Sequence, residues 1–482
     1  MVMDMRAMLL QRIYMKIVVV PMATIALLSA AHLFVASPWA YAQELPAGFS
    51  FETVARGLNQ PTSIAFAPDG RIFVGEKGGM IKVVKEGRVL PRPFYVIRDI
   101  NTHVDRGLVG IALDEDFAQN GYVYVSYTHE HDRAGPFGPK TGRIARVTAR
   151  GDSADTSSLT VLVGTAGGSS SGPLCKDLPH GSDCIPSDAE SHSVGDLVFR
   201  DGYLWASTGD GASFNGVDPL AMRSQDLDSL AGKIIRIDRN GRAPVDNPFF
   251  DGDPTGNRSK VYAYGFRNAY RFAFRPSTGT LFAGDVGWFS WEEVNVVTRG
   301  GNYGWPCYEG AFPQPDYDCT VADSDALRAP LHAYTSDRSI GPQGAIGVTG
   351  GDFMYAPAYP QAYDDVYLFG DFMQGILYAA RVDARDATVS VSTFATNGPD
   401  TPVAIKRGPD DLLYVVSITG GDIKRLAYGE HSSPIPALAE TEDMGHNATN
   451  SEERPERSFF GAIADAIASL FSSIKGLFTR TN

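Results

Sequence analysis

The sequence is poor in basic side chains relative to acidic ones. Its 482 residues include 42 Lys and Arg against 56 Asp and Glu, which gives a formal net charge of -14. A protein that binds nucleic acid needs a basic face to neutralise phosphates. The composition therefore argues against nucleic acid as a partner, and we interpret the acidic surface as a contribution to solubility only.

Cysteine is also scarce, with four residues in the whole chain. Cys175 and Cys184 lie close together in the sequence, as do Cys307 and Cys319, and neither pair has the C-x-x-C spacing of a zinc site. Among the possible pairings, local ones close the shortest loops. We therefore expect the disulfides Cys175–Cys184 and Cys307–Cys319, formed in an oxidising compartment, with a zinc site as the less favoured alternative.

Long apolar runs are rare as well, and the clearest one, Ile17 to Val35, lies near the N-terminus. Basic residues precede it, and an A-x-A type cleavage site follows at Ala40-Tyr41-Ala42. This arrangement predicts a secretory signal peptide over residues 1–42 and a periplasmic or secreted protein. A membrane anchor is the alternative, but Pro21 and Pro38 disfavour a permanent span.

Helical periodicity is almost absent between Phe49 and Tyr428. A unit of strand, tight turn and strand recurs about six times instead, for example in Ser63–Phe66 and Arg71–Gly75 around the turn Pro68-Asp69-Gly70. Repeated antiparallel units are typical of a β-propeller. We predict an all-β domain over residues 43–428, a six-bladed β-propeller of four-stranded antiparallel blades, and consider a β-sandwich as the alternative.

The composition changes after Tyr428. Gly429 to Arg457 is polar, acidic and proline-containing, which predicts a flexible linker over residues 429–457. Residues 458–480 have apolar side chains mainly at steps of three and four, which predicts a C-terminal amphipathic helix. Its apolar face can pack on the propeller, on a second copy, or on a membrane surface, and we expect peripheral membrane contact without a span.

The stretch from Val261 to Pro306 contains residues that strands do not require. These are Arg267-Asn268, Gly287-Trp288 and Asn302-Tyr303-Gly304-Trp305. With them the stretch resembles the glucose/sorbosone dehydrogenase family, which includes soluble quinoprotein sugar dehydrogenases and non-enzymatic relatives such as the hedgehog-interacting proteins. The resemblance extends over most of Phe49 to Tyr428.

Membership would imply a sugar dehydrogenase that binds pyrroloquinoline quinone (PQQ) and calcium at the propeller mouth and passes electrons to an external acceptor. A propeller that binds a glycan or a protein without catalysis is the alternative. By position, His192 resembles the general base of the family, Asp210 its active-site Asp and Arg267 its active-site Arg. The resemblance implies that the backbone carbonyls of Gly287 and Trp288 bind calcium, a cation that prefers oxygen ligands.

In the implied reaction, His192 takes the hydroxyl proton of the sugar while hydride passes from C1 to the quinone, and Arg267 stabilises the charge that develops there. Each of these residues also has an ordinary structural interpretation: a packing His, a turn-forming Asp and an Arg clamp.

The sequence departs from the family where the enzymes bind the carboxylates of PQQ with Lys and Arg. The segment that carries the Lys reads Asp371-Phe372-Met373-Gln374-Gly375 here, and Thr401 and Val403 match the two Arg positions. Lys406 and Arg407 lie close by in the sequence and are the candidate cofactor-binding substitutes. Asp105 matches the position of a substrate-contacting Gln.

Overall fold

The computed structural model describes residues 45–429, except for 132–134, 136, 168–170, 320–326, 336–346 and 397. The predicted signal peptide and C-terminal helix lie outside the described residues, as does the predicted linker apart from Gly429. Within the described ranges, we find no helix with the length and apolar character needed to cross a bilayer.

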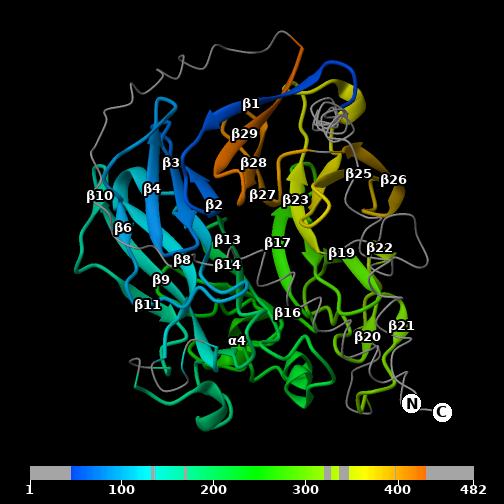
Figure 1. Cartoon of the computed structure of the whole chain (residues 1–482). Helices are drawn as coiled ribbons and strands as arrows, with labels where there is room; N and C mark the ends of the chain where they lie inside the picture. The colour runs from blue at the N-terminus through cyan, green and yellow to red at the C-terminus, as the bar shows by residue number, and fades with distance from the viewer. Residues whose placement is uncertain are drawn as a thin grey trace, which may run out of the picture. The chain divides into compact units, whose positions relative to one another are not determined.

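The strands form six antiparallel sheets, each with at least four strands (Figure 1). The first sheet contains β2 (Pro61–Phe66), β3 (Ile72–Glu76), β4 (Met80–Lys85), β5 (Arg88–Val89) and β6 (Tyr95–Val96). The second contains β7 (Leu108–Leu113), β8 (Tyr122–His129), β9 (Lys140–Arg150), β10 (Ser153–Ala154), β11 (Thr160–Val163) and β12 (Ile185–Ser187). The third contains β13 (Val194–Arg200), β14 (Tyr203–Thr208), β15 (Lys233–Ile237) and β16 (Val261–Tyr264).

The remaining sheets continue around the ring. The fourth contains β17 (Ala269–Phe274), β18 (Leu281–Asp285), β19 (Trp291–Val297) and β22 (His332–Thr335). The fifth contains β23 (Val348–Phe353), β24 (Tyr367–Asp371), β25 (Ile376–Val382) and β26 (Thr388–Ala395). The sixth contains β27 (Pro402–Arg407), β28 (Leu413–Ser417), β29 (Asp422–Tyr428) and β1 (Phe49–Ala55), and a small ribbon is formed by β20 (Tyr308–Glu309) and β21 (Phe312–Pro313).

The sixth sheet closes the ring by joining the two ends of the domain. The first strand of the chain, β1, pairs antiparallel with the last, β29, with Phe49 opposite Tyr428. Phe49 is buried against Tyr359 and Phe394 as well as Tyr428, so aromatic packing supports the closure. This pairing confirms the predicted six-bladed antiparallel propeller and excludes the sandwich.

The first strand of each complete unit lies innermost, because β2, β7, β13, β17, β23 and β27 contact one another in sequence and β27 contacts β2. Each of these six strands pairs with the next strand of its own sheet, and each pairing contains a register shift near the first residues of the inner strand. Bulges of this kind re-aim side chains. We call the face at which these inner strands begin the mouth face.

Hydrophobic cores lie between neighbouring sheets. Phe73 on β3 packs in one cluster with Val123 on β8, and Ile144 on β9 packs in another with Ile235 on β15. Each blade therefore buries both of its faces, and the residues that face water are concentrated at the loops. The few helices are short: α3 (Phe117–Asn120), α4 (Asn257–Lys260), η2 (Cys175–Asp177), η3 (Pro219–Gln225) and η5 (Gln361–Tyr363).

Both predicted disulfides are confirmed. Cys175 bonds Cys184 with Cα atoms 5.6 Å apart, and Cys307 bonds Cys319 with Cα atoms 5.5 Å apart. One bridge lies in the insertion that precedes His192, and the other follows Trp305. Each closes a loop beside the residues that the sequence singled out.

Arg271 on β17 fills the centre of the ring and is 1% exposed. Its guanidinium donates hydrogen bonds to the carbonyl oxygens of Val403 on β27 (2.9 Å), Val109 on β7 (3.1 Å) and Thr62 on β2 (2.7 Å). The carboxylate of Asp196 on β13 lies 3.8 Å away. One side chain therefore links four inner strands and approaches a fifth.

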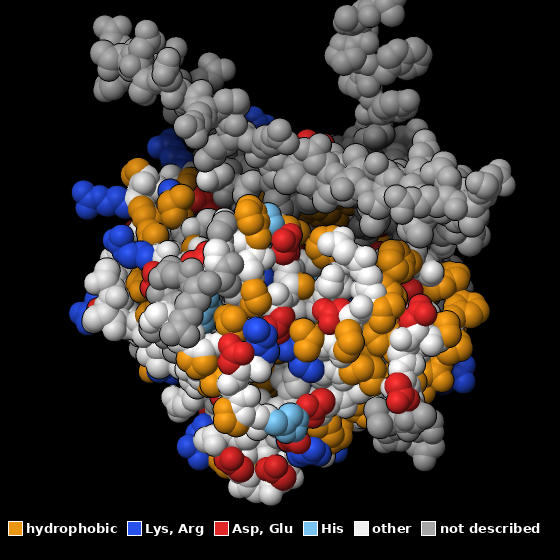
Figure 2. All heavy atoms as spheres, turned by 60° about the horizontal axis from the view of Figure 1, so that its bottom comes forward, with side chains coloured by type: hydrophobic (Ala, Val, Ile, Leu, Met, Phe, Trp, Pro, Cys, Tyr) orange, Lys and Arg blue, Asp and Glu red, His pale blue; other side chains and the backbone are white. Residues whose placement is uncertain are grey.

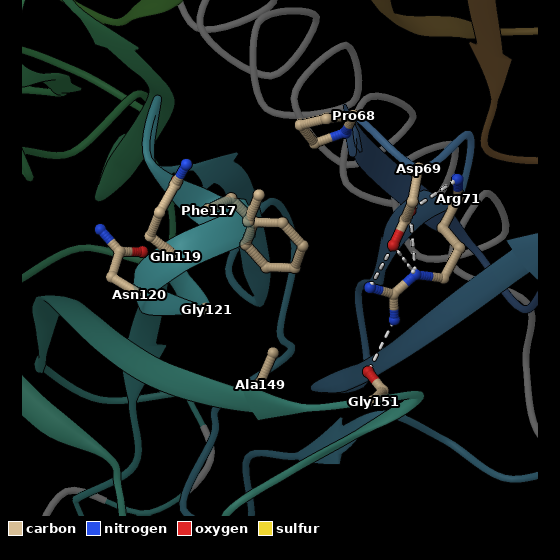
Figure 3. Close-up of a pocket in the computed structure, with 10 residues that line it drawn as sticks. Pro68, Asp69, Arg71, Phe117, Gln119, Asn120, Gly121, Ala149 and Gly151 are labelled. Carbon is tan, nitrogen blue, oxygen red and sulfur yellow. Dashed lines mark hydrogen bonds and ion pairs between the residues drawn. The ribbon is translucent and has the colours of Figure 1, made fainter.

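A separate cavity of about 470 Å³ lies at the opposite ends of the inner strands, between the first two sheets (Figure 3). Arg71 closes one side of it, paired with Asp69 and bonded to the carbonyl of Gly151, while Phe117 of α3 forms the other side. The two charged residues that line the cavity, Arg71 and Asp69, bind each other, and the cavity shares no residue with the mouth face.

Candidate active site

His192 lies on the mouth face immediately before β13, in a backbone conformation that few residues adopt. Its φ is +58°, in the left-handed region. The conformation is held from both sides, because the backbone N–H of His192 donates to Oδ2 of Asp105 (2.9 Å) and its carbonyl accepts from the N–H of Gly211 (2.9 Å). A Cβ at Gly209 would overlap the His192 carbonyl, so this glycine is required for the close approach.

Asp210 follows β14 and is 1% exposed. It accepts hydrogen bonds from Nδ1 of His192 (3.1 Å), the indole Nε1–H of Trp305 (2.8 Å) and the N–H of Ala212 (3.0 Å). Burial by itself raises the pKa of Asp210, but the hydrogen bond from His192 and the nearby charge of Arg267 outweigh it and lower the pKa below its usual value. The carboxyl is therefore an ionised acceptor.

The tautomer of His192 follows from this contact. A carboxylate only accepts hydrogen bonds, so Nδ1 of His192 carries the proton and Nε2 is left as the basic nitrogen. The arrangement is a buried imidazole oriented by a buried carboxylate, which is the geometry of a general base and its positioning group.

Arg267 lies just before β17, beside Asp210. Its carbonyl accepts the N–H of Asp210 (2.8 Å), and its guanidinium lies 5.4 Å from the centre of the Trp305 ring. The guanidinium donates to the carbonyls of Val286 (3.1 Å) and Gly287 (2.5 Å). The fold therefore brings together three candidate residues, His192, Asp210 and Arg267, and the loop that contains Gly287 and Trp288.

Asp285 holds the backbone on which Arg267 lies. Its carboxyl accepts the backbone N–H groups of Arg267 (3.1 Å) and Asn268 (2.6 Å). Burial raises the pKa of Asp285 to about 7, because the charged form loses its solvation. Asp285 thus fixes the backbone from which Arg267 projects.

The loop that contains Gly287 and Trp288 is held by one buried carboxylate. Oε1 of Glu309 accepts four consecutive backbone N–H groups, from Trp288 (2.6 Å), Phe289 (2.9 Å), Ser290 (3.0 Å) and Trp291 (3.2 Å). Its Oε2 accepts from the side chain of Gln314 (2.8 Å). Successive N–H groups that converge on one anion make a rigid turn, so Glu309 sets the direction of the loop carbonyls.

Replacing Glu309 by Gln should lower the free energy of unfolding by about 1–3 kcal/mol, because four donors lose a charged acceptor. A denaturant titration measures this loss. The matched control is Glu115→Gln, since Glu115 also accepts two backbone N–H groups, from Asp201 and Gly202, but is exposed. Equal losses in the two variants would show that the buried carboxylate has no special part in holding the loop.

The residues fit the reacting end of a PQQ–calcium group. Backbone carbonyls line the loop, a guanidinium lies beside them, and a Cβ at Gly287 would overlap the carbonyl of Trp291, so that this position has no room for a side chain. Carbonyl oxygens suit a hard cation such as calcium. Arg267 bonds the Gly287 carbonyl here, so calcium would share or displace that contact.

The structure does not bring Lys406 and Arg407 to this group, which corrects the expectation that they replace the carboxylate clamp. Lys406 points into the centre of the ring, where its ammonium lies 2.5 Å from Asp196. Arg407 is the last residue of β27, at the end away from the mouth face, and pairs with Asp411 at 2.9 Å. Both cations are used within the fold.

The sequence gives no role to two further residues of the site, Trp305 and Glu309, and suggests a different role for a third, Asp105. Trp305 is a member of the Asn-Tyr-Gly-Trp landmark but was given no role, and here it donates to Asp210. Glu309 had no signal beyond its nearness to that landmark. Asp105 matches a substrate-contacting position in the sequence, whereas here it is half-buried and accepts the backbone N–H of His192.

Comparisons with known proteins identify the family of the chain. A family model described as Glucose / Sorbosone dehydrogenase matches residues 58–425. The chain is 25% identical over 374 residues to aldose sugar dehydrogenase YliI of Escherichia coli K12, covering 77% of this chain and 91% of that protein. It is 28% identical over 304 residues to quinoprotein glucose dehydrogenase B of Acinetobacter calcoaceticus, covering 60% of each.

Other relatives are not named as dehydrogenases. The human Hedgehog-interacting protein is 26% identical over 250 residues, which cover 47% of this chain and 31% of that protein. Among solved structures, a glucose dehydrogenase-like oxidoreductase of Thermus thermophilus matches with a TM-score of 0.58 and 26% identity over 79% of this chain and 100% of that one. The PQQ-bound aldose sugar dehydrogenase of Streptomyces coelicolor matches in fold, with a TM-score of 0.56 and 23% identity over 80% of this chain and 99% of that one.

Proposed function

The chain belongs to the glucose/sorbosone dehydrogenase family, and we propose that it is an exported sugar dehydrogenase that uses PQQ and calcium to oxidise a hydroxyl of an aldose. The observation that carries the proposal is the hydrogen bond between buried His192 and buried, ionised Asp210, with Arg267 beside them. Relatives named as aldose sugar and quinoprotein glucose dehydrogenases support the same reaction.

The protein groups have distinct parts in this reaction. Nε2 of His192 takes the proton from the sugar hydroxyl, and Asp210 keeps the ring oriented and stabilises its protonated form. Arg267 supplies a positive charge where negative charge develops. When bound, PQQ would supply the acceptor for the hydride that leaves the sugar carbon.

Binding of the group would rest on the loop and on Arg267. The carbonyls of Gly287 and Trp288 would hold calcium, and Glu309 keeps the loop in shape. Trp288 and Trp305, whose rings lie 5.9 Å apart, place apolar surface beside Asp210, to which the Trp305 indole donates. The electrons would then leave to an external acceptor, and the predicted signal peptide would place the enzyme in the periplasm or outside the cell.

A cofactor titration tests the proposal. Purified chain titrated with PQQ in the presence of calcium should show saturable quenching of tryptophan fluorescence, with chelation of calcium weakening it. Arg267→Met should weaken binding at least about tenfold, since it removes the charge beside the loop. Arg407→Met is the matched control and should bind as the wild type does, because Arg407 pairs with Asp411 away from the mouth face.

A titration that shows no binding would contradict the proposal. Absence of PQQ binding at micromolar concentrations, with and without calcium, would favour a propeller that binds a glycan or a protein without redox chemistry. Equal weakening by Arg267→Met and Arg407→Met would place the cofactor elsewhere.

A further inference from the structure

Exposed aromatic side chains are concentrated on the loops of the mouth face. Among the described residues, Phe137 is 60% exposed, Phe289 52% and Phe312 55%. Phe137 follows β8, Phe289 follows β18, and Phe312 lies on the β20–β21 ribbon that packs beside Trp291 at the start of β19. Aromatic rings left in water on one face mark a binding surface.

Two of these rings form platforms with a second ring. Phe289 lies 4.2 Å from Trp288 between ring centres, and Phe312 stacks on Trp291 at 5.4 Å with an interplanar angle of 20°. Each platform is held by the fold, because the backbones of Trp288, Phe289 and Trp291 all donate to Glu309. Rings that are fixed in this way lose little conformational freedom when they bind a ligand.

A continuous series of contacts joins the first platform to the candidate active site. Trp288 contacts Trp305 at 5.9 Å, and Trp305 donates to Asp210, which orients His192. On the surface, hydrophobic side chains gather on the right of the face in Figure 2, the side on which β20 and β21 lie in Figure 1. The aromatic surface therefore leads outward from the reacting position.

Polar groups lie around the platforms, and exposed Asp316 and Asp318 follow Gln314 in the sequence. Ser290 follows Phe289, the side chain of Gln314 follows the β20–β21 ribbon, and exposed Asn215 lies next to Phe214, whose carbonyl accepts from the Trp288 indole (3.2 Å). The nearby carboxylate of Glu309 is 2% exposed and is occupied by its N–H donors. Flat apolar rings beside hydrogen-bonding groups match a pyranose, which has an apolar C–H face and a rim of hydroxyls.

We propose that the mouth face binds an oligosaccharide, with the reacting terminal unit beside His192 and the following units stacked on the Trp288–Phe289 and Trp291–Phe312 platforms. The proposal rests on the proposed function for the reacting unit, but the platforms bind sugar whether or not redox chemistry occurs. It makes Phe289 and Phe312 specificity residues for chain length. They are not catalytic residues.

The test is calorimetric binding of glucose, maltohexaose and cellohexaose to the full chain without added cofactor. At least one hexasaccharide should bind about tenfold more tightly than glucose. Phe289→Ala and Phe312→Ala should each weaken that hexasaccharide about fivefold and leave glucose binding unchanged, as expected for loss of one aromatic contact. Tyr355→Ala is the matched control, since Tyr355 is an exposed aromatic that follows β23 at the end away from the mouth face.

Several results would overturn the inference. They are equal affinity for glucose and both hexasaccharides, equal losses for glucose and hexasaccharide in the platform variants, or a comparable loss in Tyr355→Ala. If the protein reduces dye with glucose but its affinity does not depend on chain length, the oligosaccharide proposal is wrong and the dehydrogenase proposal stands. If the protein binds a hexasaccharide tightly but does not bind PQQ, the oligosaccharide proposal stands and the dehydrogenase proposal is wrong.

Discussion

Replacing His192 by Asn is expected to lower the turnover of the PQQ- and calcium-loaded protein by about a hundredfold or more, because the reaction loses its general base. Asn suits the position, since it tolerates the left-handed backbone that His192 adopts, with a φ of +58°. The variant should fold normally and bind PQQ with unchanged affinity. Steady-state dye reduction with an aldose measures the effect.

Two companion variants make this result specific. Asp210→Asn should also lower turnover strongly, because an amide no longer fixes the proton on Nδ1 of His192 or stabilises the charged ring. His180→Asn should leave turnover unchanged, since His180 is an exposed residue whose side chain is 70% accessible. Near-normal turnover in His192→Asn would remove this residue from the mechanism.

Replacing Arg271 by Met should lower the free energy of unfolding by about 3–5 kcal/mol, which is more than we expect for Glu309→Gln. The change leaves three inner-strand carbonyls without their donor and removes a cation near buried Asp196. Lys406 still pairs with Asp196 at 2.5 Å, which limits the loss. Denaturant unfolding followed by circular dichroism measures it.

Arg385→Met is the control for this prediction. Arg385 pairs with Asp383 at 3.3 Å, but its side chain is 88% exposed, and exposed pairs contribute about 0–1 kcal/mol. If Arg271→Met costs no more than Arg385→Met, the central guanidinium does not hold the ring together.

The repeated hairpins and the local disulfides could be predicted from sequence because both depend on residues that are near one another in the chain. Turns such as Pro68-Asp69-Gly70 signal strand pairs directly. The closure of the ring by β1 and β29 gave no local signal, since it joins residues at opposite ends of the domain.

In the candidate site, too, some residues could be predicted from local sequence and others could not. His192, Asp210 and Arg267 were identified by motif, and the fold places them in contact. Lys406 was assigned to the cofactor because it lies near the matched positions in sequence, but its partner is Asp196, 210 residues away. Lys406 lies near the end of β27, away from the mouth face. Which face a position on a strand reaches depends on the direction of that strand in the assembled propeller, and the local sequence does not give it.

Trp305 and Glu309 show why the rest of the site could not be read from the sequence. Each acts through hydrogen bonds across loops, one to Asp210 and one to the N–H groups of residues 288–291. Such contacts have no periodic pattern, because they depend on how long loops from different blades meet on one face.

The most direct test of the account is a single-turnover measurement on the loaded protein without an external acceptor. After rapid mixing with glucose or another aldose, the absorption of bound PQQ should change to that of the reduced form, and the rate should fall about a hundredfold or more in His192→Asn at equal cofactor occupancy. An unchanged spectrum with every aldose in the wild type, or the same rate in His192→Asn, would contradict the assignment of this site as that of a sugar dehydrogenase.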